Sequence, residues 1–522
     1  MSELGKSIGS FIGGSFNELF FRKKSGLDIE IGQLLVAGKN KENYSIYQIN
    51  DLLHGSQIPE SSIELIAGYK LEREKSNLEI YEPELRNYVL AKVKPLIEIK
   101  DGKPILPKKL PEFLGEVYEI EEFHLNFLQE KEIDNPITIG KVRSGSKVLD
   151  IDVSLEATEI LDHHILIPAT TGRGKSNLVK VVLFNLIDNE NVGKLILDPH
   201  NEYYETLKQH PNSLKQVKYY TVRDIHGKLE LEFNVNLLTP EHIMGSISLS
   251  NAQSEALVVY YREDRENGYN DWIRNIFTSD PAPGVHPSTI EALRRKLSIL
   301  LDIEYFTNDS GELDVNPRGI YTLSGSETII NDIIKYLKEG KTVIVDTSLF
   351  TGNEEIFIAT IILNNVFSHY RRAKFNGTLE NLPVITTILE EAPRVIGKKV
   401  LDVSDNIFGT IAKEGRKFNN GMVAITQLPS IIEREILANM NTKIILGNEM
   451  GPERMAIINS AAQDLSESYQ AIGSLDKGEA IITSNFTKFA IPIKIPLIDD
   501  LIMEFKSMKE KTDDNTVERS PF

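Results

Sequence analysis

The chain has 522 residues, 41% of them hydrophobic, and carries a formal net charge of −18. That length predicts several domains, and the acidic balance excludes a general nucleic-acid-binding surface, so any contact with DNA must use local basic loops. The absence of cysteine excludes disulfides and thiolate metal sites and is typical of a reducing compartment. No apolar run approaches the roughly 20 residues of a membrane-spanning helix, and the first residues do not resemble a secretory signal. We therefore expect a cytoplasmic protein with no membrane partner.

The N-terminal part of the chain has β-like segments. Short apolar runs at 34–37, 45–49 and 88–93 are separated by Gly, Asn-Asp and Pro clusters. Short strands at this spacing are typical of a small barrel or sandwich. A second β-like pair, 137–140 and 148–151, follows this part of the chain.

From residue 165 onward, apolar strands alternate with helices, which is the pattern of a parallel α/β sheet. The candidate core strands are residues 165–168, 195–198, 343–346, 384–389, 422–426 and 443–446. Helical stretches at 252–265 and 289–301 interrupt the series, and 479–482 with 489–495 are expected to form a closing hairpin.

These changes in pattern predict five segments. They are a β domain (1–135), two parts of an α/β core (136–239 and 339–500), a helical insertion between those parts (240–338), and a polar C-terminal tail (501–522). We expect the tail to begin as a helix and to end disordered.

Residues 169–176, Ala-Thr-Thr-Gly-Arg-Gly-Lys-Ser, stand between an apolar strand and an apolar-periodic helix. They are one residue short of a Walker A pattern, because Ala169 replaces its first glycine. Glycines here let backbone N–H groups turn toward phosphates at a helix N-terminus, the lysine reaches the β- and γ-phosphates, and the serine holds Mg²⁺. The pattern predicts ATP and Mg²⁺ as cofactors, bound by Thr171, Gly172, Arg173, Gly174, Lys175, Ser176 and Asn177.

The strand at 384–389 ends in two carboxylates, as a Walker B strand does. We expect Glu390 to hold the Mg²⁺ shell, partly through water, and Glu391 to activate the attacking water as general base. A strand that merely ends in solvated acids is the alternative, and the nucleotide loop upstream favours the catalytic interpretation.

Four more residues are candidates for the same site. Asp198 ends a strand, where α/β sheets place their ligands, and is expected to support Mg²⁺ or the water. His200 follows it, and the lack of cysteine or of a second histidine at ligand spacing favours a hydrogen-bonding or cap role over a metal ligand. Gln427 ends the strand at 422–426, where an amide can sense the γ-phosphate or orient water. Arg416 lies on a helix before that strand and is either an ordinary surface arginine or an arginine finger that acts across a subunit boundary.

Together these motifs resemble the HerA family of hexameric DNA translocases, within the HerA/FtsK group of RecA-like motors. The matching stretches are 169–176, 197–203, 389–393, 411–418, 427–430 and 475–482. The resemblance spans roughly 137–495, and residues 91–111 are similar to the end of the family's N-terminal β-barrel, the HAS-barrel. It implies an α/β fold, a RecA-like P-loop NTPase core with a helical insertion, preceded by that barrel.

The resemblance also implies a function, an ATP-driven homohexamer with double-stranded DNA in its central channel. It assigns Lys175 and Ser176 to phosphate and Mg²⁺, Glu391 to catalysis, and Arg416 to a finger acting in trans. Family members work with partners, either the nuclease NurA in DNA end processing or a nuclease or sirtuin-type effector in anti-phage defence. His163 stands where archaeal relatives carry an arginine, and a neutral histidine supplies no fixed charge there.

Two other functions stay open on the sequence alone. One is a nucleotide-gated ring scaffold that assembles and regulates an anti-phage effector enzyme, and the other is a conjugation or secretion motor ATPase, against which the β domain and the lack of a membrane segment count. A basic loop inside a ring would favour the translocase. Lys398 and Lys399, just beyond the Walker B strand, are candidates for DNA binding, with a solvated pair as the alternative.

Overall fold

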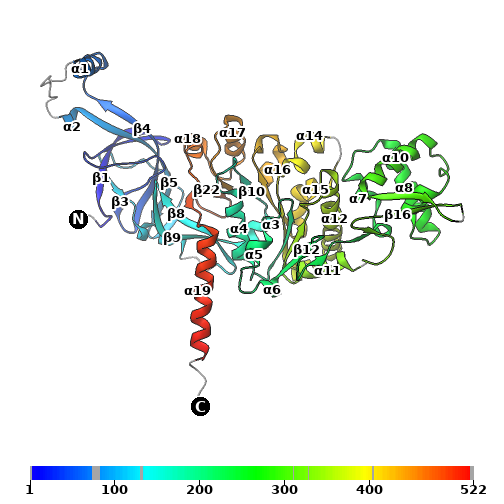
Figure 1. The fold of residues 1–522 in the computed structure, drawn as a ribbon. Helices are drawn as coiled ribbons and strands as arrows, with labels where there is room; N and C mark the ends of the chain where they lie inside the picture. Colours follow the sequence, from blue (N-terminus) through cyan, green and yellow to red (C-terminus); the bar gives the residue numbers. More distant parts are fainter. Residues whose placement is uncertain are drawn as a thin grey trace. The chain divides into compact units, whose positions relative to one another are not determined.

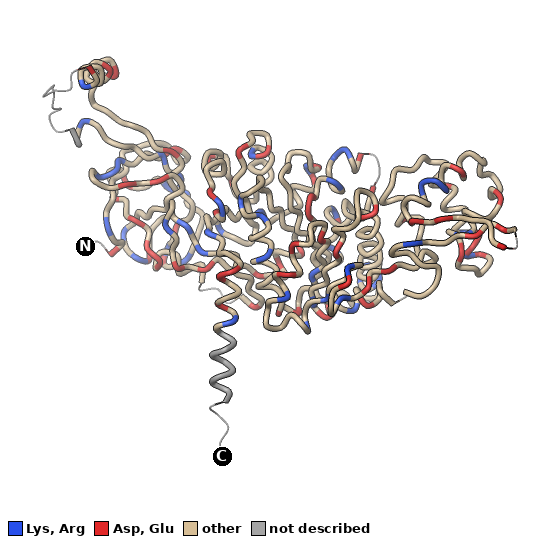
Figure 2. Tube along the Cα trace, in the orientation of Figure 1, with Lys and Arg blue, Asp and Glu red and all other residues tan. Residues whose placement is uncertain are grey.

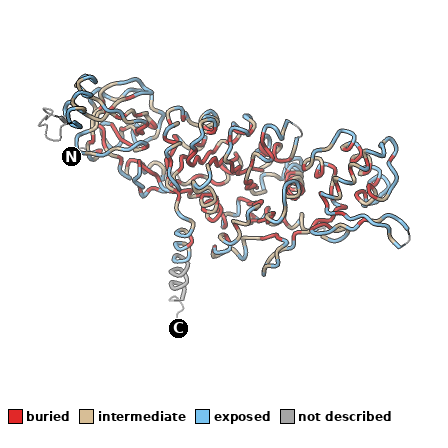
Figure 3. The backbone as a smooth tube through the Cα atoms, turned by 45° about the horizontal axis from the view of Figure 1, so that its top comes forward, coloured by how far each residue is buried: buried red, intermediate tan, exposed pale blue. Residues whose placement is uncertain are grey.

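The computed structural model describes residues 3–72, 83–129, 133–309, 311–326, 328–402 and 405–517. The chain forms two compact units (Figure 1). The first comprises Met1–Leu155, Ala169–Gly174 and Thr442–Pro496, and the second comprises Glu156–Pro168, Lys175–Asn441 and Leu497–Phe522. In both units the buried residues concentrate in the strands and in the helices packed on them (Figure 3).

The N-terminal part of the first unit is a closed barrel of six antiparallel strands. In barrel order these are β2 (Glu18–Lys23), β1 (Ser7–Ser15), β7 (Glu116–Glu119), β3 (Leu34–Asn40), β4 (Asn43–Ser56) and β5 (Asn87–Lys100). Pairing of β2 with β5 closes the ring, and β6 (Lys103–Ile105) adds to the outer end of β5. Alternate side chains such as Phe11, Phe21 and Ile49 fill the interior. Of the two folds that the sequence favoured, the barrel is therefore confirmed.

A second group of strands in this unit runs in the order β21 (Thr442–Ile445), β22 (Glu479–Ser484), β23 (Ile491–Lys494), β8 (Pro136–Ser144) and β9 (Lys147–Glu156). The antiparallel pairing of β22 with β23 confirms the predicted closing hairpin. β21 covers most of the segment predicted at 443–446, but it pairs antiparallel with β22.

The second unit contains a parallel sheet of seven strands. Their order is β13 (Leu229–Glu230), β12 (Val217–Thr221), β18 (Thr342–Asp346), β11 (Val192–Asp198), β19 (Val384–Leu389), β20 (Asn420–Thr426) and β10 (Ile165–Pro168). Every neighbouring pair is parallel, so all the carboxyl ends meet at one edge. Each of the five core strands predicted in this part of the chain is found, and the sheet gains β12 and β13, which were not predicted.

Helices pack on the sheet of this unit, among them α4 (Lys175–Leu186), α11 (Ile329–Lys338), α12 (Asn353–Phe375) and α15 (Ile407–Glu414). The long helix α12 has eleven buried residues along its length. Gly193 in β11 permits close packing, since a Cβ at that position would lie 2.3 Å from the Leu337 carbonyl oxygen of α11. Backbone of a helix therefore rests almost directly on the central strand.

The segment predicted as a helical insertion begins with α7 (Pro240–Met244), α8 (Asn251–Glu266), α9 (Trp272–Thr278) and α10 (Pro287–Leu300). Ser250 caps α8, because its side chain accepts a hydrogen bond from the Gln253 N–H. The segment also holds an antiparallel ribbon, β15 (Ile303–Thr307) with β16 (Leu313–Pro317), and the short β14 (Phe233–Asn234) pairs with β17 (Tyr321–Thr322). Trp272 anchors the helices, since its buried indole N–H donates to the Leu238 carbonyl at 3.1 Å.

The chain ends in α19 (Ile498–Val517), the red helix of Figure 1. Its first turns pack on α4 of the same unit through Phe505, whose ring lies 5.3 Å from that of Phe184, and Ile502 is buried. The final residues, 518–522, for which disorder was expected, lie outside the described residues. None of the helices in the described part of the chain has the length and apolar character needed to cross a membrane.

A lysine in the central strand β11 is fully buried. The Lys194 ammonium group donates to the carbonyl oxygen of Asn189 at 3.0 Å and to that of Gly340. Burial lowers the pKa of Lys194 from 10.5 to about 7. The folded chain therefore releases this proton near neutral pH, whereas the unfolded chain retains it to a much higher pH.

We expect a rise from pH 7 to pH 9 to stabilise the wild-type chain by about 2 kcal/mol more than it stabilises Lys194→Met. Between the folded and unfolded pKa values of Lys194 the unfolded state binds more protons, so stability rises with pH, and the cost of burial is full only below pH 7. Denaturant unfolding at both pH values, followed by the fluorescence of the single tryptophan, measures the difference. An equal change in the two proteins would contradict it.

Candidate nucleotide-hydrolysis site

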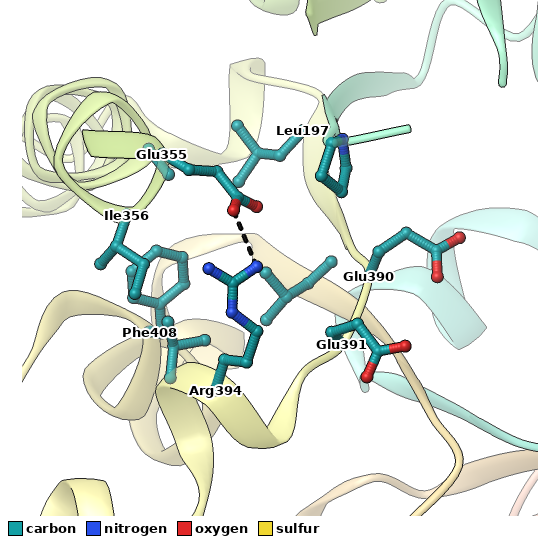
Figure 4. Close-up of a pocket in the computed structure, with 11 residues that line it drawn as sticks. Leu197, Glu355, Ile356, Glu390, Glu391, Arg394 and Phe408 are labelled. Carbon is teal, nitrogen blue, oxygen red and sulfur yellow. Dashed lines mark hydrogen bonds and ion pairs between the residues drawn. The ribbon is translucent and has the colours of Figure 1, made fainter. Parts of the chain in front are cut away.

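Two adjacent carboxylates follow the central strand β19 at the carboxyl edge of the parallel sheet. Glu390 has a side chain only 5% exposed, whereas that of Glu391 is 38% exposed. Figure 4 shows both carboxylates pointing away from Arg394, which pairs with Glu355 at 2.7 Å. The two acids therefore face the same side, and the more accessible one is Glu391.

Lys175, the first residue of α4, lies between these acids. Its Nζ is 3.4 Å from Glu390 Oε2 and 3.9 Å from Glu391 Oε1. An ammonium group at this distance offsets part of the repulsion between the carboxylates. The structure thus brings together three residues that the sequence placed in one site, although Lys175 and the acids are more than two hundred residues apart in the chain.

The backbone of Glu391 is in the left-handed region, with φ +48°. Non-glycine residues adopt this conformation rarely, at a cost of roughly 1–3 kcal/mol, and such residues cluster at functional sites. Hydrogen bonds on either side hold it: the Ala392 N–H donates to Ile425 O at 3.1 Å and the Arg394 N–H donates to Glu391 O at 2.9 Å. The direction of the Glu391 side chain is therefore set by the main chain.

Asp198 ends β11 at the same edge, but its carboxylate is turned to its own main chain. Oδ1 accepts from the N–H groups of His200 at 3.3 Å and Glu202 at 3.1 Å, and Oδ2 accepts from that of Tyr203 at 3.1 Å. Burial raises the pKa of Asp198, and these bonds oppose that effect. The side chain holds the turn after β11, and the ring of His200 is exposed on that turn.

Tyr203, which the sequence did not single out, ends this turn. Its ring is buried, and its hydroxyl donates a hydrogen bond to Glu390 Oε1. Burial, followed by the negative charge of Glu390, raises the pKa of Tyr203 well above its ordinary value, so the phenol stays protonated. The turn after β11 therefore reaches the carboxylate at the end of β19.

The loop 169–174 is described within the first unit. Gly172 and Gly174 have φ +83° and +97°, a region open to glycine, and a Cβ at Gly172 would meet nothing within 4 Å. Arg173 is tied down by Glu449, with Nε 2.9 Å from Oε1, and by the Leu475 carbonyl at 2.8 Å. Its guanidinium thus supports the loop, and Glu449 is a further residue that the sequence did not reveal.

Two other contacts support this loop. The Thr170 hydroxyl donates to Gly447 O at 3.0 Å and to Glu449 Oε2 at 2.9 Å, and the Gly478 N–H donates to Arg173 O at 3.2 Å. The stretch 475–482 therefore contacts the nucleotide loop through the main chain. Its position explains a motif for which the sequence offered no chemical role.

The remaining candidates of the loop lie as follows. Thr171 is exposed, and Ser176 is partly buried in the first turn of α4. Asn177 Oδ1 accepts from the Ile498 N–H at 2.9 Å, so it caps α19. Gln427 is half-buried and directly follows β20 at the carboxyl edge. A strand, a glycine loop and a helix that begins with Lys-Ser fit a nucleoside triphosphate with Mg²⁺. This metal usually takes few protein ligands and keeps phosphate oxygens and waters as its other ligands.

Arg416 is not near this cluster in its own chain. It lies on the short 3-10 helix η4 (Gly415–Phe418) before β20, and its side chain is exposed. The seven residues of β20 separate it from the carboxyl edge, a span of roughly 20 Å. It lines a cleft at the opposite, amino edge together with His163 and His164, which precede β10. Burial is the main cause that lowers the pKa of His163, and Arg416 lowers it further, so the ring is neutral.

Lys398 and Lys399 form the start of α14 (Lys398–Leu401), beyond α13 (Pro393–Ile396). Both side chains are exposed, and no ion pair holds either of them among the residues that the structure describes, which exclude the nearby 403 and 404. Figure 2 shows the basic stretch on α14. The structure thus leaves this pair accessible and brings it near no other candidate residue of the site.

Comparison with known proteins gives consistent matches. Residues 137–366 match the family model described as the central domain of helicase HerA. The DNA double-strand break repair helicase HerA of Sulfurisphaera tokodaii is 27% identical over 455 residues, which cover 82% of this chain and 83% of that protein. The protein of the same name from Pyrococcus furiosus is 24% identical over 454 residues, covering 78% and 77%. A solved structure of the bacterial conjugative coupling protein TrwB has a TM-score of 0.47 and 10% identity, covering 72% of this chain and 92% of that one.

Removal of the lysine or of the exposed acid is expected to separate binding from turnover. Lys175→Ala should lose tight binding of ATP, because the ammonium group that meets the phosphates is gone. Glu391→Gln should still bind ATP but turn it over roughly 10²–10⁴-fold more slowly, the usual contribution of a general base. Nucleotide titration and phosphate release measure the two effects. An active Glu391→Gln protein would instead point to Glu390 as the base.

Proposed function

Since the chain belongs to the HerA family, we propose that it hydrolyses ATP and couples hydrolysis to movement along double-stranded DNA. The observation that carries the proposal is a division of residues between two edges of one sheet. Lys175, Glu390 and Glu391 meet at the carboxyl edge, and Arg416 is exposed at the amino edge. The relatives named DNA double-strand break repair helicase support the same class of activity.

Each residue of the carboxyl edge then has a defined task. Lys175 would bind the β- and γ-phosphate oxygens, and Ser176 with Glu390 would hold Mg²⁺, which neutralises phosphate charge when bound. Glu391 accepts a proton from the attacking water, whose oxygen bonds to the γ-phosphorus. The bond from that phosphorus to the bridging oxygen breaks, and the products are ADP and inorganic phosphate. Gln427, which directly follows β20, would orient the water.

Arg416, the arginine assigned to the transferred phosphate, lies at the amino edge of the sheet in its own chain. Arg416 is separated by the length of β20 from its own carboxyl edge, so it can serve only another copy. A contact between one edge and the opposite edge of the next copy is heterologous, and such contacts form a ring when the rotation between copies closes. We therefore propose a homohexamer in which each Arg416 completes the neighbour's site.

DNA contact is proposed to be confined to the inside of this ring. The net charge of −18 opposes binding of DNA to the outer surface, whereas a few lysines repeated around a ring concentrate positive charge. Lys398 and Lys399 are accessible and lie on α14, which follows the catalytic strand after α13. Movement of that strand end during hydrolysis would then be passed to the DNA.

A partner enzyme is part of the proposal. The chain has no second catalytic set in its sequence, so cutting of DNA would fall to another protein, a NurA-like nuclease in end processing or a defence effector. A ring that only gates such an effector would hydrolyse ATP without stimulation by duplex DNA. ATPase assays with and without duplex DNA, on a sample of measured mass, distinguish the motor from the gated scaffold.

Arg416→Ala is expected to keep the oligomer and its ATP affinity but to lose roughly 10³-fold or more of the hydrolysis rate. Lys417→Ala, a neighbouring exposed cation on the same short helix, is the control and should remain active. Mixing Arg416→Ala with Lys175→Ala chains rebuilds one intact interface, so some activity should return if interfaces fire independently. An Arg416→Ala ring with the wild-type rate would refute the assignment.

Changing Lys398 and Lys399 to Glu is expected to weaken duplex binding and to make its salt dependence shallower, because fewer phosphates are neutralised. The control changes Lys108 and Lys109 to Glu, an exposed pair elsewhere in the chain with the same change in net charge. Binding titrations at several salt concentrations measure both. Equal weakening in the two variants would assign the effect to net charge instead of to α14.

A further inference from the structure

We propose that Tyr203 is a positioning residue, whose hydrogen bond to Glu390 orients one oxygen of that carboxylate toward the phosphate-binding end of the site. The turn held by Asp198 in turn fixes the position of Tyr203. The inference rests on the proposed ATPase function. It gives a role in that function to the buried hydrogen bond that joins the turn after β11 to the end of β19. In the motif that contains Tyr203, the Asp198 carboxylate accepts hydrogen bonds from its own main chain, whereas the Tyr203 hydroxyl contacts Glu390.

The two oxygens of Glu390 have different partners. Oε1 accepts the hydrogen bond of the Tyr203 hydroxyl, and Oε2 lies 3.4 Å from Lys175 Nζ. Tyr203 thus fixes the rotation of the carboxylate about its last bond and leaves Oε2 on the side of the lysine. A carboxylate that is held in this way keeps one oxygen for the lysine or for Mg²⁺ without reorganisation.

Tyr203 is itself held firmly. Its N–H donates to Asp198 Oδ2 at 3.1 Å, and its carbonyl accepts from the Leu207 N–H at 3.0 Å at the start of α5 (Tyr204–Leu207). The next residue, Tyr204, stacks on Tyr219 with the ring centroids 4.0 Å apart. The main chain that carries the phenol is therefore held by contacts that do not involve Glu390.

The neighbouring strand ends clamp the same turn. The Tyr219 hydroxyl lies 3.1 Å from Asn201 Oδ1 and 2.9 Å from Asp346 Oδ2, and the Thr347 N–H donates to Asp198 O at 3.1 Å. Asp346 is buried at the end of β18, in register with Asp198. The polar network thus extends from the end of β18 through the turn to Glu390.

Packing alone does not explain a tyrosine here. A buried hydroxyl costs free energy unless it is hydrogen-bonded, and phenylalanine fills nearly the same volume without that cost. Tyr370 offers a comparison in the same unit, since it is equally buried but its hydroxyl donates to a main-chain carbonyl, Pro383 O, at 3.1 Å. The hydroxyl of Tyr203 differs because it contacts the side chain of Glu390, a residue of the site.

The test compares Tyr203→Phe with Tyr370→Phe. Removal of the Tyr203 hydroxyl frees Glu390 to turn both oxygens toward Lys175, so kcat should fall 10- to 100-fold, the usual effect of a lost supporting partner. The Mg²⁺ concentration for half-maximal activity should rise by a similar factor. Tyr370→Phe loses a hydrogen bond of the same kind elsewhere and should leave both quantities within twofold of the wild type.

Two readouts do not depend on a single rate. Titration of a fluorescent ADP analogue at several Mg²⁺ concentrations should show that Mg²⁺ tightens binding less in Tyr203→Phe than in the wild type. In a double-mutant cycle, Tyr203→Phe should add little to the loss of activity caused by Glu390→Gln, because the neutral amide has no charged oxygen to be oriented. Additive effects in the cycle would overturn the inference.

The outcomes separate this inference from the proposed function. A wild-type protein without ATPase activity would refute the proposed function itself. An active wild type with an equally active Tyr203→Phe, unchanged in its Mg²⁺ dependence, would refute only the role of Tyr203. Should Tyr203→Phe fail to fold, Asp198→Asn loosens the turn and keeps the phenol, and an unchanged Mg²⁺ dependence in that variant would overturn the inference equally.

Discussion

Parallel pairing of buried strands in one register is the constraint on which the site depends. Because β10, β11, β19 and β20 all run the same way, the residues that follow each of them arrive at a single edge. Lys175, Glu390 and the turn at Asp198 lie together at this edge although they belong to separate segments of the sequence. The same pairing sends whatever precedes a strand to the other edge, and Arg416 lies there for that reason.

Under the proposed function, this geometry makes hydrolysis depend on assembly of several copies. The carboxyl edge holds two acids and one lysine, a set that still needs a cation opposite the lysine. A flexible loop could have brought an arginine to its own site, but a seven-residue strand is stiff and keeps the two edges apart. In the proposed function, Arg416 of a second copy completes the chemistry, so isolated chains are expected to have little activity.

The sequence predicted what depends on local pattern and missed what depends on distant contacts. The segments that became β10 and β19 are short runs of mostly apolar and β-branched residues, and their predicted limits agree with the structure at both ends. Tyr203 and Glu449 were missed because their partners, Glu390 and Arg173, are 187 and 276 residues away. Strand β1 carries Gly9, Gly13 and Gly14, which hide its alternation, and it is held by pairing with β2 and β7.

The link between Asn177 and α19 has a consequence for how the chain responds to its ends. Asn177 directly follows the residue assigned to Mg²⁺, and its side chain accepts the Ile498 N–H that begins the last helix. Two elements that share a bond share a free energy, so ordering of one favours ordering of the other in equal measure. A protein that binds α19, or a tag fused to it, would then change the affinity of the chain for nucleotide. Nucleotide would in the same way change the affinity of α19 for its binding partner.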